Sequence, residues 1–117
     1  MNCPRCQARM LEVSIGKDSA EIELCPGCNG SFYQRAEFEV VLSMTRVALE
    51  RSPLRPILRA ERLDGIALQR PVDCPVCGET MKRTEFSAAC PVEVDVCVAH
   101  GIWLDDGELA RVHDSLG

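Results

Sequence analysis

Apolar and polar residues alternate at period two in two parts of the chain, which predicts two β-hairpins. In the first part the alternating apolar residues are Leu11, Val13 and Ile15, followed by Ile22 and Leu24. The sequence Gly-Lys-Asp-Ser at residues 16–19 lies between them and supplies the turn. In the second part the pattern runs from Met81–Phe86 through Ser-Ala-Ala-Cys-Pro to Val92, Val94 and Val96. Period two is the signature of strands that bury one side.

Helical spacing of apolar residues follows each hairpin. After the second hairpin, Asp105 is expected to be the N-cap, with Glu108 three residues later as in a capping box. The apolar face of this helix is formed by Leu109, Val112 and Leu116. After the first hairpin, one longer helix is predicted over residues 34–50, with a face formed by Phe38, Val41, Leu42, Thr45 and Leu49.

A helical connector is predicted after this longer helix. The sequence Ser-Pro-Leu-Arg-Pro at residues 52–56 ends the helix, because proline cannot continue a helical hydrogen-bond ladder. A second helical piece is expected from Pro56 to Asp64, and Gly65 suits its C-terminal end. The connector is therefore expected to set how the two hairpin units face one another.

The chain repeats itself at a period of about 71 residues, which predicts two similar modules. The motif Cys-Pro-x-Cys at Cys3–Cys6 recurs at Cys74–Cys77, and Cys25 matches Cys97. The predicted organisation is a first module over residues 1–45, a helical connector over residues 46–71 and a second module over residues 72–117. The predicted fold class is a small metal-stabilised α+β protein, with two zinc ribbons that each contain a β-hairpin and a short helix.

The cysteine spacing predicts two structural zinc ions per chain. Zinc prefers four ligands in a tetrahedron, and two C-x-x-C loops can direct four sulfurs at one ion. The first set is Cys3, Cys6, Cys25 and Cys28, and the second is Cys74, Cys77, Cys97 and His100. His100 follows Cys97 by three residues, which is the interval between Cys25 and Cys28. Iron remains an alternative at the first set, because four thiolates suit either metal.

Other uses of the cysteines are less favoured by their context. Cys90 fits no C-x-x-C loop and is expected to be a small apolar residue within the second hairpin. A redox dithiol of the thioredoxin type would require a βαβ pattern, which this sequence does not show.

The residues next to the predicted zinc ligands suit the loops that hold a metal ion. Prolines 4, 26 and 75 stiffen the loops, and Asn29 and Gly78 tolerate a left-handed backbone after the second cysteine.

Composition and charge narrow the class of protein further. The chain has 117 residues and is 46% hydrophobic but only 4% aromatic. Two separate cores of this size would therefore need bound metal to be stable. It shows neither a basic and apolar signal segment nor an apolar run long enough for a membrane span, so we expect a cytoplasmic protein without membrane contact. Its net charge of −5 becomes more negative when thiolates bind zinc.

Each copy resembles the transcription-factor-IIB-type zinc ribbon family, also called the transcription factor zinc-finger domain. The family pattern is a C-P-x-C loop, a hairpin, a second loop and a tail that the second copy matches as "GIWLDDGEL" at residues 101–109. The first copy has "GSFYQRAEF" at residues 30–38, so the resemblance places Phe32 where Trp103 stands and Glu37 where Glu108 stands. His100 departs from the pattern by replacing a cysteine.

The aromatic residues and the remaining polar residues are expected to be structural. Trp103 and Phe32 are expected to cover the metal loops and to pack on the following helices. His113 is expected to be a solvated helix residue. Asp105 and Asp106 are interpreted as helix-start residues rather than as a catalytic pair, and a zinc ion with four protein ligands has no open position. We therefore expect no enzymatic activity.

A zinc-stabilised adapter that binds another protein is the favoured function. The apolar connector residues Leu54, Ile57, Leu58, Leu63 and Ile66 exceed what a small helix needs, and they are expected to pack between the ribbons, to dimerise the chain or to bind a partner helix. The alternative is a nucleic-acid-binding transcription regulator with a basic stripe of Arg51, Arg55, Arg59 and Arg62. The acidic net charge weighs against this alternative.

Overall fold

The computed structural model describes residues 1–15, 20–58, 71–90, 92–105 and 107–116. Several sequence predictions fall outside these ranges. They are the turn at residues 16–19, the connector beyond Leu58 with its end at Gly65, two of the four stripe arginines (Arg59 and Arg62), and the apolar residues Leu63 and Ile66.

Both predicted hairpins are present. In the first copy β1 (Leu11–Ile15) pairs antiparallel with β2 (Ala20–Leu24), and in the second copy β4 (Lys82–Glu85) pairs antiparallel with β5 (Glu93–Cys97). The two ladders have matching registers, since Val13 lies opposite Ile22 and Thr84 lies opposite Val94. The internal repeat of the sequence is therefore a repeat of structure.

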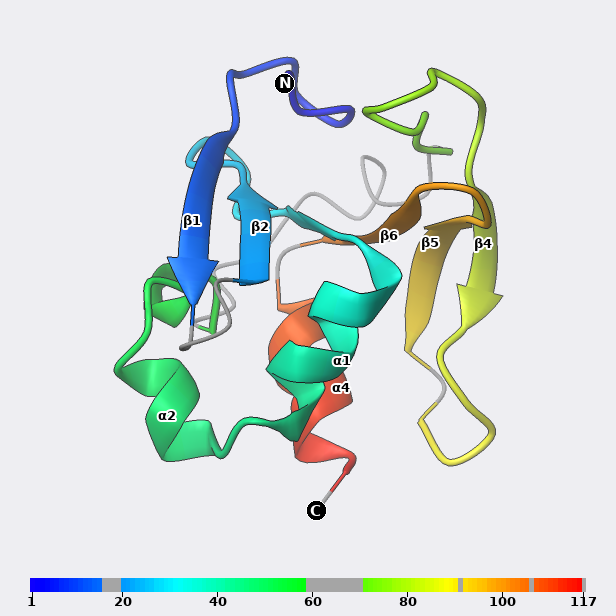
Figure 1. Cartoon of the computed structure of the whole chain (residues 1–117). Helices are drawn as coiled ribbons and strands as arrows, with labels where there is room; N and C mark the ends of the chain where they lie inside the picture. Colours follow the sequence, from blue (N-terminus) through cyan, green and yellow to red (C-terminus); the bar gives the residue numbers. More distant parts are fainter. Residues whose placement is uncertain (16–19, 59–70, 91, 106, 117) are drawn as a thin grey trace.

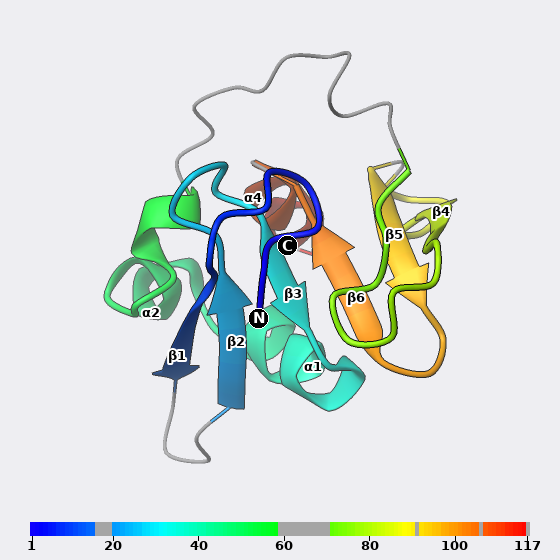
Figure 2. The ribbon, with the colours of Figure 1, turned by 90° about the horizontal axis from the view of Figure 1, so that it is seen from above.

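Each copy has a third strand that the hydrophobic pattern did not predict. Strand β3 (Ser31–Tyr33) pairs with β2, and β6 (Gly101–Leu104) pairs with β5. The two additional strands also pair with each other, with Phe32 opposite Trp103. The result is one six-stranded antiparallel sheet in the order β1-β2-β3-β6-β5-β4 (Figure 2). Strand pairing therefore joins the two zinc ribbons directly, a role that the sequence analysis gave to the connector.

The long helix predicted over residues 34–50 is wrong, because the chain forms two shorter helices there. Helix α1 (Arg35–Ser43) ends before Met44, whose backbone is extended. Helix α2 (Arg46–Glu50) starts afresh after Thr45, whose hydroxyl accepts a hydrogen bond from the Ala48 N–H at 3.1 Å. Thr45 is thus an N-cap and not a member of a helical face, which is a common role for threonine.

The described part of the connector packs into the protein. It forms the 3₁₀ helix η1 (Arg55–Leu58), and its apolar residues Leu54, Ile57 and Leu58 are buried. Helix α4 (Glu108–Asp114) follows β6 and packs on η1. On α4, the predicted apolar residues Leu109 and Val112 are buried, whereas Leu116 is exposed and lies beyond the helix end.

Two apolar cores lie on opposite faces of the sheet. The helix-side core joins residues of the hairpins, helices and connector, and includes Tyr33, Leu104 and the predicted hairpin residue Cys90. The loop-side core joins Phe32 and Trp103 to the cysteine loops. Figure 1 shows the helices below the sheet and the two cysteine-loop ends above it. Among the described residues, no helix combines the length and apolarity needed to span a bilayer.

Candidate metal centres

The C-P-x-C loops that begin the two copies, Cys3–Cys6 and Cys74–Cys77, have the same backbone hydrogen bonds. In the first loop the Cys3 N–H donates to the Ala8 carbonyl at 2.7 Å, and the Gln7 N–H donates to the Cys3 carbonyl at 2.9 Å. In the second loop Cys74 donates to Glu79 at 2.7 Å, and Gly78 donates to Cys74 at 2.8 Å. These bonds close each loop so that both of its cysteine side chains point to one side.

The backbone of these loops also directs N–H groups at sulfur. The N–H groups of Arg5 and Cys6 lie 3.3 and 3.4 Å from the Cys3 Sγ, and the N–H of Val76 lies 3.4 Å from the Cys74 Sγ. Such donors stabilise a thiolate more than a thiol. The loops are therefore built to carry negatively charged sulfur.

The first metal centre brings together Cys3, Cys6, Cys25 and Cys28, whose ligand atoms all lie within 4.8 Å of one another. The Sγ atoms of Cys3 and Cys28 are 3.6 Å apart, and those of Cys6 and Cys25 are 3.4 Å apart. A regular tetrahedron with Zn–S bonds of about 2.3 Å places its sulfurs about 3.8 Å apart. The four thiols thus lie close to the arrangement that a tetrahedral ion requires.

The second metal centre brings together Cys74, Cys77, Cys97 and His100, also within 4.8 Å. The Sγ atoms of Cys77 and Cys97 are 3.9 Å apart, and the Cys97 Sγ lies 3.5 Å from the His100 Nδ1. The sulfur–nitrogen separation expected for tetrahedral zinc is about 3.6 Å. His100 therefore stands where the fourth ligand must be, while Cys90 lies apart in the helix-side core.

The surroundings shift the pKa values of the thiols in opposite directions. The hydrogen bond from Cys28 lowers the pKa of Cys3 to about 5, and His100 lowers the pKa of Cys97 to about 7. Burial raises the pKa of Cys25 to about 11. The bond shared with Cys3, together with burial, raises the pKa of Cys28. A divalent ion must displace the remaining thiol protons, so metal binding at both centres is coupled to proton release.

Left-handed residues end three of the four ligand loops. The sequence analysis expected this backbone at Asn29 and Gly78, and they have φ of 61° and 78°. The structure adds Gln7, with φ of 68°, at the position of the first loop that matches Gly78 in the repeat. Propensity alone did not reveal Gln7, because glutamine has no special preference for this region. The signal that could have found it is the repeat itself.

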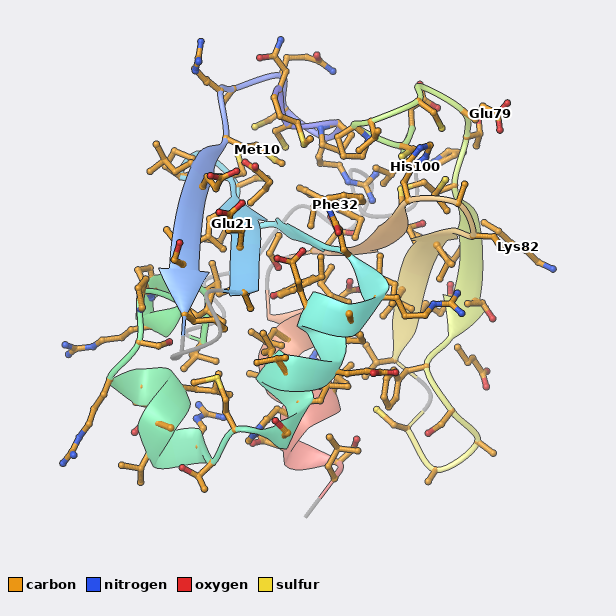
Figure 3. All side chains as sticks on the ribbon, viewed as in Figure 1. Met10, Glu21, Phe32, Glu79, Lys82 and His100 are labelled. Carbon is orange, nitrogen blue, oxygen red and sulfur yellow. The ribbon has the colours of Figure 1, made fainter. Side chains whose placement is uncertain are left out.

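Phe32 and Trp103 pack in one core with cysteines of both metal centres. They are 4% and 0% exposed and contact the cysteine-lined core, so the expectation that they cover the metal loops is met. The second half of that expectation is wrong, since their rings lie on the loop side of the sheet, opposite the helices. Figure 3 shows Phe32 between the two hairpins, and His100 at the turn between β5 and β6. Pairing of β3 with β6 fixes the two aromatic residues side by side.

A buried polar network ties the first metal loop to the second copy. Arg5 donates from Nε and Nη2 to the two carboxylate oxygens of Asp105, at 3.1 and 2.9 Å. Asp105 also accepts from the Trp103 Nε1 at 2.9 Å. Asp95 extends the network through Arg83, with Nε to Oδ1 at 3.2 Å. Burial raises the pKa of Asp95 and Arg83 opposes the shift, so the pair limits the cost of the buried carboxyl.

Asp105 is therefore not a helix cap, contrary to the sequence analysis. Gly107 occupies the N-cap position of α4, and it makes no side-chain cap. One half of the expected capping box remains, because the Glu108 carboxylate accepts from the Asp105 N–H at 2.7 Å. Burial raises the pKa of Glu108 to about 7. The Asp105 carboxylate instead accepts from Trp103, two residues away, and from Arg5, which lies 100 residues away in sequence and so beyond the reach of a local pattern.

The other predicted residues are distributed over separate elements. Arg51 and Arg55 are exposed, but Arg51 follows the end of α2 and Arg55 begins η1, so no continuous helix carries both. His113 is half-buried, and its Nε2 contacts the Met44 carbonyl oxygen, which corrects the expectation of a solvated side chain.

Comparison with known proteins identifies both copies. The family model described as "Transcription factor zinc-finger" matches residues 2–44 and again residues 73–115, which together exceed half of the chain. No curated protein and no solved structure matches the chain. The two matched segments contain all eight predicted metal ligands.

Proposed function

Because this chain belongs to the transcription factor zinc-finger family, with two zinc ribbons in one sheet, we propose that it is a protein-binding adapter ordered by two structural zinc ions. The proposed compartment is the cytoplasm. The proposal does not require an enzymatic activity. Its partner is another protein, and a homodimer is the closest alternative within this class.

The observation that carries the proposal is the complete ligand set at each centre. The first centre has four cysteines, and the second has three cysteines and one histidine. Their ligand atoms lie at the separations expected around a tetrahedral ion. A catalytic zinc site keeps one position for water or substrate, whereas a structural site fills all four with protein atoms. The metal ions would then order the loops and the loop-side core, and so fix the surface that a partner contacts.

Charge favours a protein partner over a nucleic acid. The net charge is −5, and three of the described arginines, Arg5, Arg46 and Arg83, form ion pairs with acidic residues. Affinity for nucleic acid rests on phosphate neutralisation by exposed basic groups. The exposed side chains of Arg51 and Arg55 support the alternative of nucleic-acid binding, and their separation on two elements weakens it.

Affinity capture with the zinc-loaded full chain tests the proposal. The bait is presented to an extract of the source cell after nuclease digestion, with the chelator-treated chain as the matched control. We expect one or more proteins to be retained by the zinc-loaded bait alone. The proposal would be contradicted if capture disappears on nuclease treatment, or if the chain binds DNA or RNA tightly at physiological salt in a gel-shift titration.

A further inference from the structure

The internal repeat offers a direct comparison of the two halves of the helix-side core. In the first half, the connector fills the space between the β1–β2 hairpin and α4, since Leu54, Ile57 and Leu58 are buried in one core with both elements. Helix α4 packs directly on η1. Figures 1 and 2 agree in placing the described part of the connector, drawn in green, beside the β1 edge of the sheet.

The second half has an open groove at the matching place. A cavity of about 340 Å³ lies between α1 and the strands β4, β5 and β6. Its apolar lining consists of Phe38, Leu42, Phe86, Val94, Val96 and Ile102. This volume falls in the range of about 300–1,000 Å³ that binding pockets have. None of the described segments fills this groove as η1 fills its counterpart.

Residues at matching strand positions are more exposed in the second hairpin than in the first, as expected if nothing equivalent to η1 covers the second. Ile15 and Leu24 of the first hairpin are 3% and 7% exposed. Their repeat equivalents, Phe86 and Val96, are only half-buried. Leu24 and Val96 stand at the same register of the two ladders, and the bond from the Phe86 N–H to the Val92 carbonyl at 2.9 Å extends the second ladder to the position of Ile15. The difference therefore lies in what covers these residues and not in the pairing of the strands.

We propose that this groove binds a short helical turn of a partner protein that resembles the connector of this chain. Such a turn presents apolar residues at positions i, i+3 and i+4, as Leu54, Ile57 and Leu58 do in the occupied half. The groove is also lined by Glu39 and Glu85, against one cation, Arg35. A partner turn flanked by basic residues therefore fits best, and the connector carries Arg51 and Arg55 in this way. The inference rests on the proposed adapter function and names its docking surface.

A peptide with the sequence of residues 51–58 is the probe for this groove. Zinc-loaded full chain labelled with ¹⁵N is titrated with this peptide and followed by NMR. We expect shifts confined to α1, β4, β5 and β6. A control peptide in which serine replaces Leu54, Ile57 and Leu58 should bind at least tenfold more weakly. Shifts at the β1–β2 hairpin instead, or equal binding of the two peptides, would overturn the proposal.

Variants of the chain test whether the peptide binds in the groove. Thr84 is exposed and lines the groove, so Thr84→Arg should weaken peptide binding about tenfold without removing any core side chain. Leu42→Glu, on the other wall, should have the same effect. Val47→Glu is the matched control, because Val47 is 58% exposed on α2 and does not line the groove. Zinc content and NMR dispersion establish that each variant is folded.

The same variants separate this proposal from the adapter function. If Thr84→Arg and Leu42→Glu lose the protein captured by the parent chain while Val47→Glu keeps it, the groove is the docking surface. If all three variants keep it, the groove proposal is wrong and the adapter function stands. The groove proposal would also be overturned if residues 59–70 of the same chain, or a second copy of the chain, occupied the groove. Crosslinks from a photoreactive residue at position 84 and sedimentation analysis would detect these two cases.

Discussion

At the scale of single residues, the metal ligands were the part of the site that the sequence predicted best. Their spacing is local, because each C-x-x-C or C-x-x-H loop brings two ligand atoms together within four residues. The structure gathers the predicted set into two groups and places His100 beside Cys97. The Arg5–Asp105 contact could not be predicted in this way, since it joins residues 100 positions apart.

The buried Arg5–Asp105 pair should contribute strongly to stability. Both side chains are almost fully buried, and Asp105 also accepts from the Trp103 indole. Asp105→Ala should lower the free energy of unfolding by about 3–5 kcal/mol, because it leaves a buried cation without its nearest carboxylate. Arg46→Ala is the control, since its ion pairs are exposed and should contribute less than about 1 kcal/mol. Denaturant unfolding of the zinc-loaded chains measures both, and equal losses would refute the account of this network.

Glu108 should make stability depend on pH in a defined window. Its pKa in the folded chain is raised from 4.5 to about 7 by burial. Because this carboxyl pKa is raised, the folded state binds more protons than the unfolded state over this range. The stabilisation that protonation of Glu108 gives to the folded state is therefore complete below pH 4.5 and is lost as the pH rises towards 7. Glu108→Gln keeps the acceptor for the Asp105 N–H and should remove this part of the pH dependence. Melting curves of both proteins between pH 5 and pH 8 test this, and parallel curves would contradict it.

At the scale of secondary structure, the hairpins were predicted and the strands that join the two copies were not. Alternation over five positions identifies β1, β2 and β5, whereas β3 has three residues and β6 has four. Strands this short carry no measurable period. The single helix predicted over residues 34–50 was wrong because the capping role of Thr45 outweighed its helical spacing.

The pairing of β3 with β6 depends on a residue without a side chain at Gly30. A Cβ atom built there would overlap the indole ring of Trp103. Gly30→Ala should therefore lower the free energy of unfolding by about 1–3 kcal/mol, as overpacked core sites do. The control is Gly27→Ala, where the nearest atom, the Cys6 Sγ, lies at an ordinary contact distance of 3.4 Å. If thermal unfolding shows the same stability for both variants, the close approach at Gly30 does not hold the two copies together.

At the scale of the whole molecule, the repeat predicted two similar modules, and the structure shows how they become one body. The sheet is continuous, and the loop-side core contains ligands of both centres together with the central aromatic pair. This arrangement depends on contacts between distant parts of the chain, which hydrophobic periodicity does not encode. It also explains why a chain with 4% aromatic residues need not build two independent cores.

The central claim is that two closed four-ligand centres each hold one structural zinc ion. Native mass spectrometry of the purified full chain, with elemental analysis of the same sample, measures this most directly. The account predicts two zinc ions per chain, and one in the His100→Ala variant, with the first centre still filled. A single zinc ion in the parent chain, an unchanged count in His100→Ala, or iron in place of zinc would contradict it.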